Sequence, residues 1–100
     1  MDVKEYQRLA SEIVDKIDQK FSIKRDVQLT ISQLVEELGE LVKVANYQRL
    51  RGKKPKKKEL EDEFADVLIQ LGKLADAFDV DLEKAILDKI KILKKRHNLG

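Results

Sequence analysis

Apolar residues recur at helical spacing through almost the whole chain, and this periodicity constrains the fold more than any other feature. In four segments they lie three or four residues apart, which places them on one face of a helix. No segment of useful length alternates between apolar and polar residues as a half-buried strand would. The expected helices run from about Val3 to Phe21, from about Val27 to Leu50, from about Pro55 to near Phe78, and after Asp81 toward the C-terminus.

The segments between these helices are short: SIKRD, RGKKPKKK and DVD. Short connections place consecutive helices as antiparallel neighbours. We therefore expect an all-α fold, an antiparallel helix bundle of about four helices, with residues 1–100 forming a single domain. Every expected helix carries a wide apolar stripe, so apolar surface is left over, and we expect homo-oligomerisation to complete the bundle.

Composition excludes several classes of protein. Hydrophobic residues make up 42% and charged residues 40%, with 4 glycines and 1 proline, which suits a helical protein better than a sandwich or a disordered chain. The absence of cysteine excludes disulfides, thiolate metal sites and a cysteine nucleophile. A net charge of +2 with interspersed signs argues against nucleic acid as the main partner. Neither a membrane span nor a signal peptide is recognisable, so we expect no membrane partner and a cytoplasmic protein.

Two acidic patterns with the same spacing stand on the second and third expected helices. Each has two adjacent acids, two spacers and a third acid: Glu36, Glu37 and Glu40 in the first, and Asp62, Glu63 and Asp66 in the second. At about 100° per residue, one acid of each trio points away from the apolar stripe. The other two lie at the edge of the stripe, on the same-handed side in both helices. These edge acids are Glu37, Glu40, Glu63 and Asp66.

Antiparallel packing brings same-handed edges of two helices to one side, so the four edge acids are expected to meet. Four clustered carboxylates would repel and raise one another's pKa unless a cation neutralises them. Oxygen ligands alone suit Mg²⁺, or Mn²⁺ as a substitute, better than zinc or copper. The sequence therefore predicts a metal site. The competing interpretation is that acids three residues apart are ordinary surface charge, which describes either trio taken by itself.

The stretch EELGEL, followed by EFADVL, resembles the EExxE…ExxD signature of the MazG-like, all-α nucleoside triphosphate pyrophosphohydrolases. The similarity continues through LADAFDVDLEKAILDKIKILKKR and covers roughly Phe21 to Arg96. The resemblance implies that the same four edge acids hold magnesium and form the catalytic site. It also implies cleavage of an NTP or dNTP between the α and β phosphates, giving a nucleoside monophosphate and pyrophosphate, in a homodimer or homotetramer. Housekeeping of the nucleotide pool is the expected role.

The resemblance also implies three substrate-binding residues. Tyr47 and Phe21 correspond to aromatics that stack on the base, and Lys89 corresponds to a lysine that reaches the phosphates. Core packing is the alternative for Phe21, and ordinary surface exposure is the alternative for Tyr47 and Lys89. Leu93 and Gln70 stand where relatives often carry asparagine and tyrosine, so the choice of base and sugar is left open.

Other activities compete with this interpretation. A phosphoribosyl-ATP pyrophosphatase would resemble the same fold, but its usual histidine shortly after the last acid is missing, since VLIQL follows Asp66. A non-catalytic helical interaction module would use the charges only for solubility. The basic run Arg51–Lys58 is typical of a solvated turn, with attraction of polyphosphate as the alternative. Gly39 and Gly72 lie in helix interiors and indicate close helix approach, with a subunit contact as one hypothesis.

Overall fold

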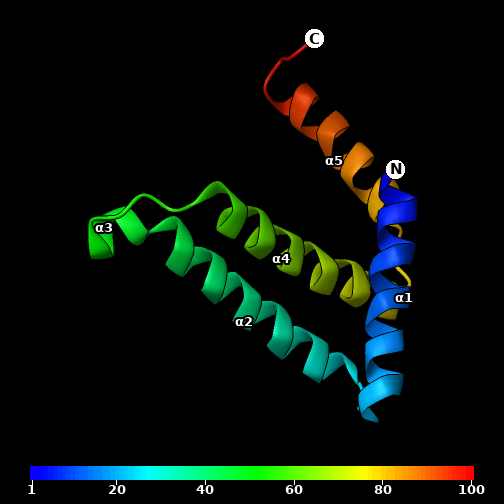
Figure 1. The fold of residues 1–100 in the computed structure, drawn as a ribbon. Coiled ribbons are helices and arrows are strands. Elements are labelled where there is room, and N and C mark those ends of the chain that lie inside the picture. The colour runs from blue at the N-terminus through cyan, green and yellow to red at the C-terminus, as the bar shows by residue number, and fades with distance from the viewer.

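Five helices and no strands make up the fold of this computed structural model, which describes residues 1–100 (Figure 1). In chain order they are α1 (Val3–Phe21), α2 (Val27–Ala45), α3 (Tyr47–Arg51), α4 (Lys57–Ala77) and α5 (Leu82–Arg96). The predicted all-α class is confirmed. Not one of these helices has the combination of length and apolar character that a membrane crossing requires.

Aspartates begin three of the long helices. The side chains of Asp2, Asp26 and Asp81 each accept a hydrogen bond from the backbone N–H three residues further on, at 2.8, 2.8 and 3.1 Å. These bonds satisfy donors that the first turn of a helix otherwise leaves unpaired. The predicted start of the last helix after Asp81 is confirmed in this way.

The joint between α2 and α4 differs from the prediction. The second helix was expected to continue to Leu50, but α2 ends at Ala45, and the short α3 follows. Asn46 lies between them, and its backbone N–H and its side-chain Nδ2 both donate to the carbonyl of Val42, at 3.0 and 2.8 Å. Pro55 was expected to begin the next helix, but it lies two residues before α4, which begins at Lys57.

Helices α2 and α4 lie side by side and antiparallel, as expected, whereas α1 crosses the C-terminal end of α4 (Figure 1). Helix α5 packs against α1 near the N-terminus and projects away from the α2–α4 pair. The radius of gyration is 16.3 Å, compared with about 13 Å for a compact domain of this length. The single chain is therefore more open than a closed up-down bundle.

Close approach of α1 to α4 depends on Gly72. A Cβ at this position would lie 2.8 Å from the Cβ of Ala10 and 3.1 Å from the hydroxyl oxygen of Tyr6. The Tyr6 hydroxyl donates to the carbonyl oxygen of Leu68, and burial raises its pKa. The close contact expected at Gly72 is thus within the chain, whereas nothing lies within 4 Å of a Cβ built at Gly39.

A buried polar network fixes the turn from α1 into α2. Arg25 donates to both carboxylate oxygens of Asp18, at 2.7 and 3.1 Å, and its other nitrogen donates to Thr30 and Gln33, at 3.1 and 2.6 Å. Asp18 and Thr30 are both buried. The paired charges explain how an acid and an arginine are accommodated in the interior. This network sets the direction in which α2, and with it Glu37, leaves α1.

The core of the single chain is small. Only 8 of 100 residues are buried, and the apolar ones are Ala10, Val14, Val44 and Ala75. Many of the predicted stripe residues are instead exposed by 38% or more, among them Leu9, Ile13 and Ile17 of α1, Val35, Leu38 and Val42 of α2, Phe64, Leu68 and Leu71 of α4, and Ile86, Ile90 and Leu93 of α5. Apolar stripes are present as predicted, but the chain alone leaves much of their surface uncovered.

Candidate metal centre

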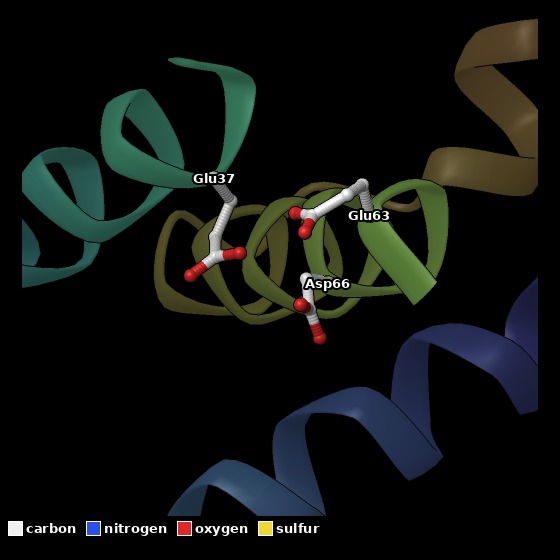
Figure 2. Close-up of side chains that lie close together, drawn as sticks. All are labelled: Glu37, Glu63 and Asp66. Carbon is white, nitrogen blue, oxygen red and sulfur yellow. The ribbon is translucent and has the colours of Figure 1, made fainter. Parts of the chain in front are cut away.

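Three carboxylates meet between the two antiparallel helices. Glu37 of α2 and Glu63 and Asp66 of α4 each offer one oxygen, and these oxygens all lie within 4.8 Å of one another (Figure 2). Glu37 and Glu63 are half-buried, and Asp66 is exposed. Because Glu63 and Asp66 are three residues apart, they share one face of α4, and α2 presents Glu37 to that face.

Burial and mutual repulsion shift the acidity of this cluster. Burial raises the pKa of Glu37, and the charge of Asp66 together with a hydrogen bond to its side chain raises it further. Burial also raises the pKa of Glu63, followed by the negative charges of Asp66 and Glu40. Without a counter-charge, the ionised forms of both glutamates are disfavoured.

No basic side chain neutralises the cluster. None of the six salt bridges of the chain involves Glu37, Glu63 or Asp66. The Oε2 atom of Glu63 is buried and has no hydrogen-bond partner in the protein. A buried acceptor without a partner is destabilising. The unpaired oxygen, the closeness of the three acids and the all-oxygen donor set fit a hard divalent cation.

The remaining acids of the two trios divide as their helical angles indicate, with one exception. Glu36 and Asp62 are exposed, and Asp62 forms a surface ion pair with Lys58 at 3.6 Å. Glu40, predicted to join the cluster, is exposed and lies outside the group of three carboxylates. Its charge nevertheless contributes to the raised pKa of Glu63, so it stands at the margin of the cluster.

The three predicted substrate-binding residues are not gathered at the acids. Tyr47 begins α3, half-buried, with the Arg51 guanidinium 5.4 Å from its ring centroid. Phe21 ends α1 and is 65% exposed, so the alternative of core packing is not observed in the single chain. Lys89 is exposed on α5, which packs on α1 and not on the α2–α4 pair.

Two features of this region go beyond the residues predicted as sites: Gln70, and a cavity formed largely by the basic run, for which the sequence suggested attraction of polyphosphate only as an alternative to a solvated turn. Gln70 was noted only as a departure from relatives, yet its Oε1 is buried without a hydrogen-bond partner. It follows Asp66 by four residues, so the helical spacing alone would have placed it on the same face. The second feature is a cavity of about 310 Å³ at the joint before α4, lined by Tyr47, Arg51, Lys53, Lys54, Lys56 and Glu59.

The antiparallel helices and the carboxylate cluster between them define an all-helical protein with a site suited to a divalent cation. The sequence model of the MazG nucleotide pyrophosphohydrolase domain matches residues 25–99. This match includes α2, α3, α4 and α5 and all the acids of both trios. The chain therefore belongs to the MazG nucleotide pyrophosphohydrolase family, and the resemblance noted in its motifs is confirmed.

The chain is also similar to one curated protein, the uncharacterized protein YpjD of Bacillus subtilis (strain 168). The two are 43% identical over 60 residues, which cover 55% of this chain and 52% of YpjD. The chain thus spans about half the length of that relative. The domain that defines the family is a nucleotide pyrophosphohydrolase domain.

Proposed function

We propose that this chain, with residues 1–100 acting as one domain, is a cytoplasmic enzyme that hydrolyses an NTP or dNTP between its α and β phosphates. The products are a nucleoside monophosphate and pyrophosphate, and the role is housekeeping of the nucleotide pool. The observation that carries the proposal is the cluster of Glu37, Glu63 and Asp66, whose oxygens lie within 4.8 Å of one another in a chain of this family.

The four edge acids are the proposed ligands of a divalent cation. Glu37, Glu63 and Asp66 hold Mg²⁺, with Mn²⁺ as a substitute, and Glu40 completes the set from the next turn of α2. When bound, the cation supplies positive charge against the phosphate oxygens and lowers the pKa of a nearby water. The unpaired Oε2 of Glu63 supports its place among the ligands.

The chemical step needs no nucleophile from the protein. Water attacks the α-phosphorus, a new phosphorus–oxygen bond forms, and the bond from the α-phosphorus to the bridging oxygen breaks. Pyrophosphate leaves with that electron pair, and a carboxylate of the cluster accepts the proton of the water. The protein contributes chiefly by positioning the reactants and by offering charge to the phosphates.

We propose further that the active form is a homodimer or homotetramer. The accessible surface of the chain is 7836 Å², whereas scaling with mass gives about 5,800 Å² for a compact monomer of this size. The excess is comparable with, or larger than, the area that each partner contributes to a stable interface. In such an assembly Lys89 and Phe21, which lie away from the acids of their own chain, bind substrate at the site of a neighbouring chain.

A substrate panel tests the proposed reaction. Standard and modified NTPs and dNTPs are incubated with Mg²⁺, and pyrophosphate is scored against orthophosphate. We expect pyrophosphate and a monophosphate in equal amounts, and we expect Glu63→Gln to abolish them. Glu61→Gln is the matched control, since Glu61 is an exposed acid on the same helix. Release of orthophosphate with a diphosphate product would rule out cleavage between the α and β phosphates.

A further inference from the structure

The cavity at the joint before α4 is strongly basic. Four of its six lining residues are cationic, namely Arg51, Lys53, Lys54 and Lys56, and Glu59 is the only acid among them. The volume of about 310 Å³ is enough for a small anion with its hydration. Lys57 and Lys58 belong to the same basic run but do not line the cavity. Four cationic residues of this run therefore border one cavity.

The cavity adjoins the metal centre along α4. Glu59 lines the cavity, and Glu63 follows it by four residues, so the two acids are neighbours on one helical face. Asp66 and Gln70 continue the same stripe at spacings of three and four residues. Along this stripe the basic cavity, the acids and the unpaired Oε1 of Gln70 follow one another over about 16 Å, at 1.5 Å per residue.

Tyr47 gives the cavity a fixed wall. Its ring lies under the Arg51 guanidinium at 5.4 Å, an arrangement that holds the arginine in place. An arginine held in this way offers its donors to a phosphate with little loss of conformational freedom. In this arrangement Tyr47 acts as a positioning residue for Arg51, in place of the base stacking that the family resemblance implies for it.

We propose that the basic cavity binds the β and γ phosphates of the substrate, so that the nucleotide lies along α4 with its polyphosphate toward the joint. The α-phosphate then lies at the acids, and the nucleoside lies toward Gln70, the next residue of the stripe. This arrangement rests on the proposed function. It makes the cavity a determinant of triphosphate over monophosphate recognition and places the leaving pyrophosphate among cations that stabilise its charge.

Binding of inorganic pyrophosphate to the full chain, measured by calorimetry with Mg²⁺ present, tests the cavity without any turnover. The double variant Lys53→Gln/Lys54→Gln is expected to bind pyrophosphate about tenfold more weakly. The control Lys57→Gln/Lys58→Gln removes the same charge outside the cavity and is expected to change affinity by less than about twofold. Glu59→Gln is expected to bind more tightly, because it removes the one repelling charge. Equal effects of the two double variants, or no effect of either, would overturn the proposal.

Steady-state kinetics test whether the cavity is occupied by the phosphates of the bound substrate or only by free pyrophosphate. The Lys53/Lys54 variant is expected to raise KM for the triphosphate about tenfold while leaving inhibition by the monophosphate product unchanged. Weaker pyrophosphate binding with an unchanged KM would mean that the cavity holds only free phosphate anions, against the proposal. If no nucleotide is hydrolysed by the unaltered chain, the proposed function fails, and the calorimetric comparison still decides whether the cavity binds polyphosphate.

Discussion

At the scale of single residues, the cluster is an arrangement of acids that the protein itself does not neutralise. Glu37 and Glu63 are half-buried, and neither forms a salt bridge. A folded chain that keeps such repulsion carries an energetic cost, which a bound cation removes. Metal binding should therefore be visible as stability, independently of any substrate.

Divalent cations are expected to stabilise the folded chain, and Glu63→Gln is expected to remove this effect. At a cation concentration about tenfold above the dissociation constant, the gain is about 1.4 kcal/mol, which corresponds to several degrees of melting temperature. Thermal melts with Mg²⁺ or Mn²⁺ against a chelator measure it. Glu61→Gln serves as the control and should melt as the unaltered chain does. If the unaltered chain melts at the same temperature with the cation as with the chelator, the metal site is contradicted.

The metal-free protein is expected to be more stable at pH 5.5 than at pH 7. Burial raises the pKa of Glu37 and that of Glu63, and the charge of Asp66 raises both further. A raised pKa means that the folded chain binds more protons than the unfolded chain just above the ordinary value of 4.5, so stability falls as pH rises through this interval. Urea denaturation in the presence of a chelator measures the trend.

Asp88 and a bound cation are expected to change this dependence of stability on pH in other directions. The pKa of Asp88 is lowered by Lys84, so its contribution is lost only at more acidic pH. Saturating Mg²⁺ should remove or reverse the gain on acidification, because a cation favours the ionised carboxylates. In the metal-free chain, Glu63→Gln should reduce the increase in stability between pH 7 and pH 5.5. Stability that is equal at the two pH values, with and without the substitution, would argue against a repelling cluster.

At the scale of helices, the turn from α1 into α2 depends on one buried ion pair. Removing Arg25 leaves the buried Asp18 without its partner, which is expected to cost about 3 kcal/mol or more. Arg8 forms an exposed pair with Glu12 at 2.9 Å, and Arg8→Ala should cost less than about 1 kcal/mol. Urea denaturation of Arg25→Ala and Arg8→Ala compares the two pairs directly. Equal losses would show that the network does not anchor the turn.

The two glycines in helix interiors are expected to respond oppositely to alanine. At Gly72 the added Cβ would lie 2.8 Å from Ala10, and the overpacking is expected to cost about 1–3 kcal/mol. At Gly39 nothing lies within 4 Å, so the single chain should gain up to about 1 kcal/mol from better helix propensity. Denaturation of the two variants at low protein concentration measures both. A loss at Gly39 that grows with protein concentration would instead place this residue in a subunit contact.

The helices and the site differ in how far the sequence predicts them. The bounds of α1 follow from periodicity, and Asp81 marks the start of α5 by its capping chemistry. The break at Asn46 was missed because the apolar pattern continues to Leu50 and does not mark it. Glu37, Glu63 and Asp66 could be selected from angles, but the distance of Glu40 depends on the rotation of α2 against α4. The basic cavity exists only where residues on both sides of the joint come together.

At the scale of the whole molecule, the open shape and the exposed apolar stripes indicate incomplete burial. The surface exceeds that of a compact monomer by about 2,000 Å² when area is scaled with mass. Uncovered stripes occur on all four long helices, including α5, which projects from the rest of the chain (Figure 1). A surface of this kind is typical of a chain that buries more area in an assembly.

We therefore expect a homo-oligomer at micromolar concentration, and Phe64→Glu is expected to weaken it. Phe64 is 55% exposed on α4, and a charge there would have to be desolvated inside an apolar contact. Gln19→Glu adds the same charge at an exposed position of α1 and should leave the assembly unchanged. Sedimentation velocity over a range of concentrations measures the mass of each variant. A monomer for the unaltered chain at tens of micromolar would show that the apolar stripes do not join copies of this chain, and Lys89 and Phe21 could then not serve a neighbouring site.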